Sequence, residues 1–443
     1  MPGEEARRVS KVLEKAKEAH NSSRSMANIS TADKNSSLRS IAKNIWDRRT
    51  EIIQANKSDL EYAKKLLERG DITEAVYSRL SLNEDKITSI CDMVNNVAEL
   101  SDPVGDTLYS IELDDGLDLY RVTSPIGVIG FIFESRPDAL VQIASLCLKS
   151  GNSCLLKGGS EAKNSNRVLF EVISDATGSM PVGWIQLLEA REDVKALLKL
   201  DEYVDLVIPR GSNMFVRYIQ DNTRIPVLGH SEGVCNIYID SEADDEMAIS
   251  ICHDSKVQYP AVCNAVDCVL VHADIAERLL PPLYDKLSNS GVSVRADSRV
   301  QEILGNRVEP FTCRDYGAEY LDYIIALRIV DNMNQAVDYI NKYGSHHTDA
   351  IITVNDEKAH RFMRSIDSAS VFWNASTRFA DGYRYGLGAE VGISTGKIHA
   401  RGPTGLEGLV SYKYYLKGRG HTVSEYIDEN RQFKHNKTDK KWG

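Results

Sequence analysis

The sequence lacks the charge and the apolar runs that would assign it to several large classes of protein. Basic residues do not exceed acidic ones, since 53 Lys and Arg stand against 64 Asp and Glu, for a formal net charge of −11. That balance is not the electrostatic footprint of a nucleic-acid-binding chain, although a local basic pocket for a small anion is compatible with it. No stretch is long and apolar enough to span a membrane, and the start MPGEEARRVSKVLEKAKEAH has no apolar signal core. We therefore expect a soluble, cytoplasmic protein that binds neither nucleic acid nor membrane.

Paired metal-ligand motifs are also missing. The eight cysteines include no CxxC pair, and most lie in apolar runs as small hydrophobic residues do, so neither a metal site nor disulfides are indicated. Cys263 differs, because QYPAVCNAVDCVLV (258–271) isolates it between a Tyr-Pro turn and an apolar strand. A buried structural thiol is the ordinary alternative. The context of Cys263 instead fits the nucleophile of a redox enzyme that acts on acyl groups.

The 443 residues and 42% apolar content predict two or three domains with a large buried core. After a mobile start, the first hundred residues are expected to be mainly helical, with Ser36 or Ser37 as the N-cap of one helix. Short apolar strands then alternate with helical segments, and one of those helices runs from near Asp138 to a C-terminal cap at Gly151. The strands are VIGFIF (128–133), SCLLKG (153–158), WIQLL (184–188) and VDLVIP (204–209). Such alternation predicts an α/β fold with a parallel, doubly wound sheet.

A second α/β region follows the first. Its expected strands are VCNIYID (234–240), CVLVH (268–272), YIIALRIV (323–330), AIITVN (350–355) and SVFWNAS (370–376). Two further segments, GLDLYRVTS (116–124) and GLEGLVSYKYYLKGRGH (405–421), alternate like exposed strands, and we expect them to pair as a small β extension used in oligomerisation. The polar final residues, DENRQFKHNKTDKKWG, are expected to be frayed.

The first α/β region has no GxGxxG after its first strand, so a dinucleotide needs another cradle. The run IPRGSNMF offers one, because Gly211 permits close backbone approach and Ser212 can cap a helix whose free amides attract phosphate. Such glycines and serines also occur in turns for geometry alone. Lys157 ends a strand and is followed by Gly158, Gly159 and Ser160. This arrangement can contact an adenosine ribose, and the lysine charge suits an added 2′-phosphate.

These segments resemble the aldehyde dehydrogenase superfamily and, within it, the γ-glutamyl phosphate reductase family, nearly from end to end. The superfamily frame lies in SPIGVIG, SCLLKGGSEA, PRGS and the run around Cys263. The reductase signatures are FESRPDA (133–139), YPAVCNA (259–265), YGSHHTDAI (343–351), NASTRFADG (374–382) and YGLGAEVGISTGKIHARGPTGLEGL (385–409). The resemblance implies an NADP-binding domain (1–115 and 125–233), a catalytic domain with Cys263 (234–395), oligomerisation strands (116–124 and 396–425) and a polar tail (426–443).

Three departures from the wider superfamily are informative. Where hydrolytic members carry a glutamate base, this chain has Gly229, and Glu232 is a less suitable substitute because of its offset. A thioester without that base would persist long enough to be reduced. Arg136 replaces the usual asparagine oxyanion donor and suits a dianionic acyl phosphate. Tyr339 stands where the reductases usually have histidine.

The resemblance also implies a mechanism and the residues that carry it. Cys263 attacks L-glutamyl 5-phosphate and forms a thioester, which NADPH reduces to L-glutamate 5-semialdehyde, the second step of proline biosynthesis from glutamate. No metal is required. The amide of Cys263, Arg136 and Asn264 are the candidate oxyanion donors. The remaining candidates are Lys157, Gly158, Ser160, Arg210, Gly211, Ser212 and Glu319 for the cofactor, and His347, Ser376, Thr377 and Arg378 for the substrate.

Several alternatives remain open at this stage. His347 can equally be a hydrogen-bonded structural histidine, and Arg401 and Lys397 are alternatives to Arg378 opposite the substrate carboxylate. An acyl-coenzyme A reductase would fit the same cysteine and missing base, and a third reading is a catalytically silent scaffold relative. We expect a homo-oligomer. Because the chain begins directly with the reductase helices, we also expect a separate glutamate 5-kinase to supply the substrate, through a transient complex.

Overall fold

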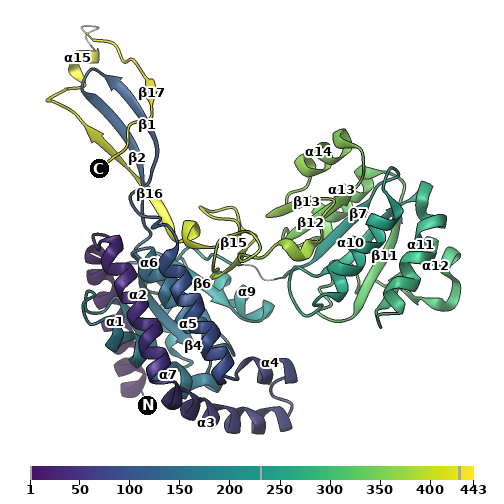
Figure 1. Ribbon diagram of the computed structural model, residues 1–443, viewed down its shortest axis with the longest axis horizontal. Coiled ribbons are helices and arrows are strands. Elements are labelled where there is room, and N and C mark those ends of the chain that lie inside the picture. The colour runs from purple at the N-terminus through teal and green to yellow at the C-terminus, as the bar shows by residue number, and fades with distance from the viewer. Residues whose placement is uncertain (1, 230–231, 428–430) are drawn as a thin grey trace. The chain divides into compact units, whose positions relative to one another are not determined.

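The structure is a computed structural model that describes residues 2–229, 232–427 and 431–443 (Figure 1). The chain divides into two compact units, which are described here one at a time. Unit 1 comprises Met1–Leu228, Leu387–Gly392 and Thr404–Gly443, and unit 2 comprises Gly229–Gly386 and Ile393–Pro403. Both units contain a parallel sheet with helices, and unit 1 adds a small antiparallel sheet, so the predicted α/β fold class is confirmed.

Unit 1 is built on the four-stranded parallel sheet β5-β4-β3-β6. The helices of unit 1 are α1 (Pro2–Met26), α2 (Thr31–Asp47), α3 (Arg49–Glu68), α4 (Glu74–Arg79), α5 (Glu84–Glu99), α6 (Pro137–Lys149), α7 (Lys163–Ala176), α8 (Asp193–Leu197), α9 (Asn213–Asp221) and α15 (Ser424–Ile427). Its strands are β1 (Thr107–Asp114), β2 (Leu117–Pro125), β3 (Val128–Phe133), β4 (Ser153–Gly158), β5 (Ile185–Leu188), β6 (Leu206–Arg210), β16 (Val410–Lys417) and β17 (Asn436–Thr438). All residues of β3 and β4 are buried, as expected for strands covered on both faces.

Two predictions about the start of the chain are wrong. The first residues are not mobile, because α1 packs Val12, Ala16 and Ala19 against the sheet core. The helix predicted to begin at Ser36 or Ser37 instead begins at Thr31, and the Ser30 hydroxyl caps it by accepting from the Asp33 amide at 3.1 Å. The Ser-Ser pair hid this earlier cap because several serines in the run satisfy the same local preference.

The helix predicted near Asp138 is confirmed as α6, with Pro137 in its first turn. It ends in the hydrogen-bond pattern of a Schellman motif, since the amide of Asn152 donates to Cys147 O and that of Gly151 to Leu148 O. Gly151 has a φ of +70°, and a Cβ there would lie 3.0 Å from the Pro125 side chain. Both the conformation and the space therefore favour glycine.

The β extension of unit 1 is an antiparallel sheet in the order β16-β2-β1-β17. The predicted pairing between the two alternating segments is confirmed as β16 with β2. The prediction that the last residues are frayed is wrong, because β17 pairs with β1 and the Trp442 ring packs edge-on against Tyr120, 5.5 Å between ring centroids. Lys440 Nζ also contacts Glu112 and Asp118 at 3.1 and 2.6 Å. Tertiary contacts thus order a polar segment that has little local preference for a strand.

Unit 2 is built on a seven-stranded parallel sheet in the order β10-β9-β11-β8-β7-β12-β13. Its strands are β7 (Cys235–Ile239), β8 (Val266–His272), β9 (Ser293–Ala296), β10 (Glu309–Pro310), β11 (Ile324–Val330), β12 (Thr348–Ile352) and β13 (Ser370–Trp373). Its helices are α10 (Asp245–Val257), α11 (Ala273–Ser288), α12 (Ser298–Leu304), α13 (Met333–Tyr343) and α14 (Asp356–Ser365). The short strands β14 (Gly392–Ser394) and β15 (Gly402–Thr404) follow.

Alternate residues of the unit 2 strands face two separate hydrophobic cores. Ile237 and Ile239 of β7 pack with α10, α11 and α12, whereas Tyr238 packs with α13 and α14. Figure 1 shows α11 and α12 on one side of this sheet. This two-sided burial explains why the strands read as continuous apolar runs in the sequence.

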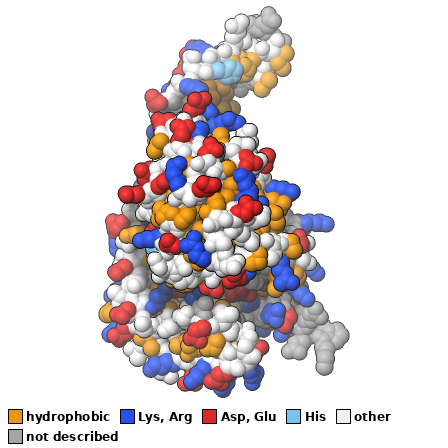
Figure 2. Space-filling view, turned by 90° about the vertical axis from the view of Figure 1, so that its right-hand side faces the viewer, with side chains coloured by type: hydrophobic (Ala, Val, Ile, Leu, Met, Phe, Trp, Pro, Cys, Tyr) orange, Lys and Arg blue, Asp and Glu red, His pale blue; other side chains and the backbone are white. Residues whose placement is uncertain are grey.

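Acidic and basic side chains are interspersed over the described part of the face seen in Figure 2. Among the described residues, no helix is sufficiently long and apolar to cross a bilayer.

Candidate active site

The predicted cofactor residues of unit 1 lie at the carboxyl ends of three neighbouring strands. In the register of the sheet, Lys157 and Pro209 lie on either side of Ile132, and Gly158 and Arg210 lie on either side of Phe133. The loops that leave β4, β3 and β6 therefore start side by side. This is the edge at which open parallel sheets bind their ligands.

A small hollow at the end of β4 fits a ligand that approaches the backbone closely. It is lined by residues that include Gly158, Gly159, Lys163, Asn166 and Glu189. A Cβ on Gly158 would lie 2.1 Å from Asn166 Nδ2, so this glycine keeps the space open. Asn166 Oδ1 is buried and has no hydrogen-bond partner among the described residues. A ribose hydroxyl is the kind of donor that such an acceptor requires.

Lys157 ends β4 with its side chain buried, and its ammonium group contacts the carbonyl oxygen of Gly158. Burial lowers the pKa of Lys157, while Glu161, Asp193 and Glu134 act in the opposite direction. Glu161 is itself held by the backbone amide and the hydroxyl of Ser135, at 2.6 and 2.9 Å. The position predicted for an adenosine ribose thus contains one buried cation among carboxylates.

The predicted phosphate turn leads from β6 into α9. Ser212 is the N-cap residue of α9, but its hydroxyl makes no capping hydrogen bond. Its amide instead donates to the Glu134 carboxylate at 3.3 Å, and a Cβ on Gly211 would lie 2.7 Å from that carboxylate. Glu134 therefore shows that the turn accepts an anionic oxygen at this helix start. Arg210 contacts Gln142 at 3.3 Å.

The candidate chemical residues of unit 2 lie at the opposite, amino edge of their sheet. Glu319, Cys263, Gly233 and His347 each precede a strand, namely β11, β8, β7 and β12. Those four strands are consecutive in the sheet and all parallel. The loops that enter them must therefore start next to one another, although the chain separates the residues widely.

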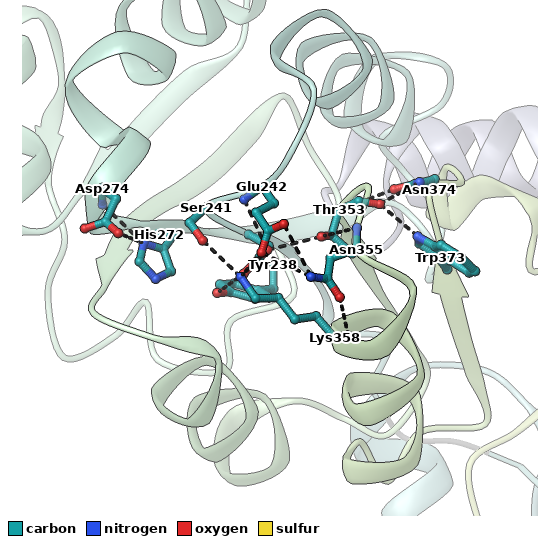
Figure 3. A network of polar contacts seen from close by, with 11 residues as sticks. Tyr238, Ser241, Glu242, His272, Asp274, Thr353, Asn355, Lys358, Trp373 and Asn374 are labelled. Atoms are coloured by element: carbon teal, nitrogen blue, oxygen red, sulfur yellow. Dashed lines mark hydrogen bonds and ion pairs between the residues drawn. The ribbon is translucent and has the colours of Figure 1, made fainter.

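The carboxyl edge of the same sheet is occupied by side chains of the protein itself (Figure 3). Lys358 Nζ lies 2.9 Å from Asp240 and 2.9 Å from Glu242, and Tyr238 donates to Asp240 at 3.1 Å. Asp240 also accepts from the Thr353 hydroxyl at 3.1 Å. Bonds within the protein thus use these groups, which leaves the amino edge as the candidate site of unit 2.

Cys263 is closely confined by its neighbours. A Cβ on Gly233 would lie 2.4 Å from Cys263 Cβ, and the Cys235 thiol donates to the Cys263 carbonyl oxygen at 3.2 Å. Cys235 Sγ also lies 3.7 Å from His347 Nδ1, and burial raises the pKa of Cys235 well above its ordinary value. Cys235 is therefore a protonated spacer between Cys263 and His347. Cys263 is partly exposed, in contrast to the buried Cys235.

The predicted substrate-binding run is clamped to the residue after Cys263. Thr377 Oγ1 donates to the Asn264 carbonyl at 2.7 Å, and Asn264 Nδ2 donates to the Ala380 carbonyl at 2.8 Å. Ser376 accepts from Ser255 at 3.1 Å. These bonds use the polar groups of Asn264, Ser376 and Thr377 for internal structure.

Arg378 has a different environment. Its Nε donates to Gln258 at 2.9 Å, and burial, helped by Arg384, lowers its pKa, although the Cys263 thiol favours its charge. Arg378 is therefore close enough to interact electrostatically with the candidate nucleophile. Of the three predicted substrate residues in this run, it retains a charge with which to bind an anion.

The alternatives Arg401 and Lys397 both contact Asp367, at 3.0 and 2.6 Å. That ion pairing engages them within unit 2. Arg136 is exposed at the N-cap of α6, where its side chain makes no capping bond. It belongs to unit 1, whereas Cys263 belongs to unit 2.

Three strained residues next to the predicted site were missed in the sequence. Ser135, His346 and Asn374 have φ values of 51°, 61° and 53°, in the left-handed region that non-glycine residues seldom adopt. They adjoin Arg136, His347 and the run that begins with Ser376. Strain of this kind concentrates at functional sites, but no residue type in the sequence reveals it.

Comparison with known proteins identifies the family. The aldehyde dehydrogenase family model matches residues 1–302. The γ-glutamyl phosphate reductase of Natronomonas pharaonis is 55% identical over 418 residues, which cover 94% of this chain and 95% of the relative. The γ-glutamyl phosphate reductase of Acetivibrio thermocellus is 53% identical over 419 residues, covering 94% and 96%.

The chain belongs to the γ-glutamyl phosphate reductases of the aldehyde dehydrogenase family. The crystal structure of the γ-glutamyl phosphate reductase of Thermotoga maritima agrees with a TM-score of 0.89 at 41% identity, and the match covers 93% of this chain and 99% of that one. The chain is thus an oxidoreductase whose family uses a nicotinamide cofactor.

Proposed function

We propose that this protein reduces L-glutamyl 5-phosphate to L-glutamate 5-semialdehyde with release of phosphate, the second step of proline biosynthesis from glutamate. One observation carries the proposal. Cys263 is confined at the amino edge of the unit 2 sheet beside Cys235 and Gly233, within electrostatic reach of Arg378. The chain also has Gly229 where a hydrolytic relative has its base. A nucleophile without a base for water favours reduction of a thioester over its hydrolysis.

The protein's part in the reaction follows from these residues. The Cys263 thiolate attacks the acyl carbon, the bond to the phosphate oxygen breaks, and phosphate leaves with the electron pair. Arg136 and the backbone amide of Cys263 are proposed to stabilise the oxyanion, and Arg378 to bind the substrate carboxylate. Substrate contacts by Asn264, His347, Ser376 and Thr377 remain predictions. NADPH, when bound, supplies the hydride that converts the thioester to the aldehyde.

The groups that would hold NADPH belong to both units. In unit 1, the hollow beside Gly158 and Ser160 is proposed to hold the adenosine ribose, and Arg210, Gly211 and Ser212 the phosphates. Lys157 is proposed to favour the 2′-phosphate over a hydroxyl. In unit 2, Glu319 is proposed to hold the nicotinamide ribose.

Replacing Lys157 with methionine tests the cofactor preference. Methionine fills similar space without charge, so we expect the KM for NADPH to rise roughly tenfold, as for the loss of one charge-assisted contact, with a smaller change for NADH. Lys195→Met, which removes an exposed lysine on α8, is the matched control and should change neither value. Equal changes for both cofactors would contradict a role in recognition of the 2′-phosphate.

The proposed function is tested in the reverse direction, because the acyl phosphate is unstable. We expect the protein to oxidise glutamate 5-semialdehyde with NADP⁺ only when inorganic phosphate is present. Oxidation without phosphate would indicate a hydrolytic dehydrogenase instead. Oxidation that requires coenzyme A in place of phosphate would identify an acyl-coenzyme A reductase.

We also propose that the β extension serves self-association. β16 is the outermost strand of its sheet, and Tyr412, Tyr414 and Leu416 are exposed on it. An exposed strand with large apolar side chains is suited to pairing with another chain. The transient complex with a glutamate 5-kinase remains a prediction, as does a cytoplasmic location.

A further inference from the structure

A buried ion pair lies next to the candidate site of unit 2 but has no place in the proposed chemistry. Lys256, near the end of α10, and Asp267, in β8, have side chains that are 0% and 4% exposed, with Nζ 3.5 Å from Oδ1. Lys256 Nζ makes no hydrogen bond within the described residues. Such a pair is a poor source of stability, because burial of two charges costs about as much as their attraction returns. Its presence therefore calls for another role.

The two residues bracket the loop that carries Cys263. Residues 257–266 leave α10 and enter β8, and the Lys256–Asp267 contact closes this loop at its base. Asp267 Oδ2 also lies 3.5 Å from the amide of Cys235, which begins β7. The pair thus joins the loop of Cys263 to the strand whose first thiol contacts the Cys263 carbonyl.

Asp267 makes a third contact, to the segment that contains Glu319. Its Oδ1 accepts from the amide of Tyr320 at 3.1 Å, and the Tyr320 ring lies 5.9 Å from Lys256 Nζ. Glu319 immediately precedes Tyr320, in a segment between β10 and β11 that forms no helix or strand. Tyr320 OH also donates to Asp315 within the same segment, at 2.8 Å. The Asp267 carboxylate therefore ties the backbone next to Glu319 to the strand that follows Cys263.

We propose that Asp267, held by Lys256, is a positioning residue that fixes Glu319 relative to the Cys263 loop. This inference rests on the proposed function, in which Glu319 holds the nicotinamide ribose and Cys263 carries the acyl group. Asp267 acts as the acceptor for the Tyr320 amide, and Lys256 keeps the carboxylate in place. Burial raises the pKa of Asp267 to about 7 and lowers that of Lys256, so each group needs the other to remain charged.

The sequence held a weak signal for this role. Asp267 is a carboxylate within the apolar run AVDCVLV, where a solvated acid is not expected. Its partner and the Tyr320 amide lie at distant positions along the chain, so only the tertiary structure shows what the carboxylate does.

Two uncharged double variants separate the acceptor from the ion pair. Lys256→Met with Asp267→Leu removes both charges and the acceptor, and Lys256→Met with Asp267→Asn removes both charges but keeps an amide oxygen that can accept from Tyr320. Affinity for NADPH is measured by titration of its own fluorescence, without substrate, alongside thermal unfolding. We expect the leucine variant to bind NADPH roughly tenfold more weakly at an unchanged Tm, and the asparagine variant to restore binding to within about threefold of the original.

Glu319→Gln then tests whether Asp267 acts through Glu319. In that background, the leucine double variant should weaken NADPH binding by no more than about a further twofold, because both changes remove the same contact. Full additivity of the two losses would overturn the proposal, as would equal NADPH affinity of the two double variants. Because the titration needs no substrate, an original protein that binds NADPH without phosphate-dependent turnover would refute the proposed function alone.

Discussion

Cys263→Ala is expected to reduce phosphate-dependent oxidation of glutamate 5-semialdehyde by about 10⁴-fold or more. A nucleophile that forms the covalent intermediate cannot be replaced by binding alone, and removal of such a group from other hydrolases has comparable effects. The neighbouring thiol of Cys235 cannot substitute, because burial raises its pKa well above the ordinary value and its proton is directed at the Cys263 carbonyl. The measurement is the initial rate of NADPH formation at saturating phosphate.

Cys313→Ala is the matched control, because Cys313 is exposed and lies outside the candidate site. It should leave the rate within about twofold of the original, as surface substitutions usually do. A second readout follows the intermediate itself. With semialdehyde and NADP⁺ but no phosphate, the original protein should accumulate one acyl group on the peptide that contains Cys263, as detected by mass spectrometry. A Cys263→Ala protein that retained more than about a tenth of the rate would refute the assignment of the nucleophile.

Gly233→Ala is expected to produce the second largest loss, about 100-fold in kcat/KM. The added Cβ would lie 2.4, 2.5 and 2.6 Å from the Cβ, O and Cα atoms of Cys263, so one of the two backbones must move. Displacement of a reacting group by about 1 Å can cost about 10²-fold in rate. The change should affect kcat/KM for the semialdehyde while the affinity for NADPH remains nearly constant, because the adenosine end of the cofactor is proposed to bind unit 1.

Gly396→Ala is the control for the added methyl group. Its Cβ would meet nothing closer than the Ser394 hydroxyl at 3.8 Å, so activity should be unchanged. Thermal unfolding of both variants shows whether any loss of activity reflects loss of fold. Alkylation of Cys263 by iodoacetamide gives an independent measure, and we expect a changed rate in Gly233→Ala. Unaltered kcat/KM in this variant would show that the close packing against Cys263 has no role in catalysis.

The parallel sheets were predictable because their strands are buried on both faces. VIGFIF and SCLLKG coincide with β3 and β4 at both ends. Cys263 was also predictable, since its local run separates it from the other cysteines and the family signatures surround it. Each of these inferences depends on neighbours in the sequence, where periodicity and motif are informative.

The features that escaped prediction depend on residues far apart in the chain. β17 is a strand because β1 offers an edge and Glu112 and Asp118 offer partners for Lys440, and no local preference indicates it. The contact of Gly233 with Cys263 and the three bonds of Asp267 likewise appear only when β7 and β8 lie side by side. The sequence also placed ligand chemistry at carboxyl strand ends, which describes the unit 1 residues, whereas Cys263 and His347 lie at amino ends.

The pairing of β2 with β16 has a consequence for synthesis of the chain. β2 ends at Pro125 and β16 begins at Val410, so the edge that β16 covers has no partner until almost the whole chain has left the ribosome. At roughly 5–20 residues per second, that edge stays open for roughly 15–60 s. All strands of the unit 2 sheet are synthesised in the meantime, because β13 ends at Trp373. Unit 2 can therefore fold while unit 1 still displays a strand edge, and a nascent chain at this stage is the form most in need of a chaperone.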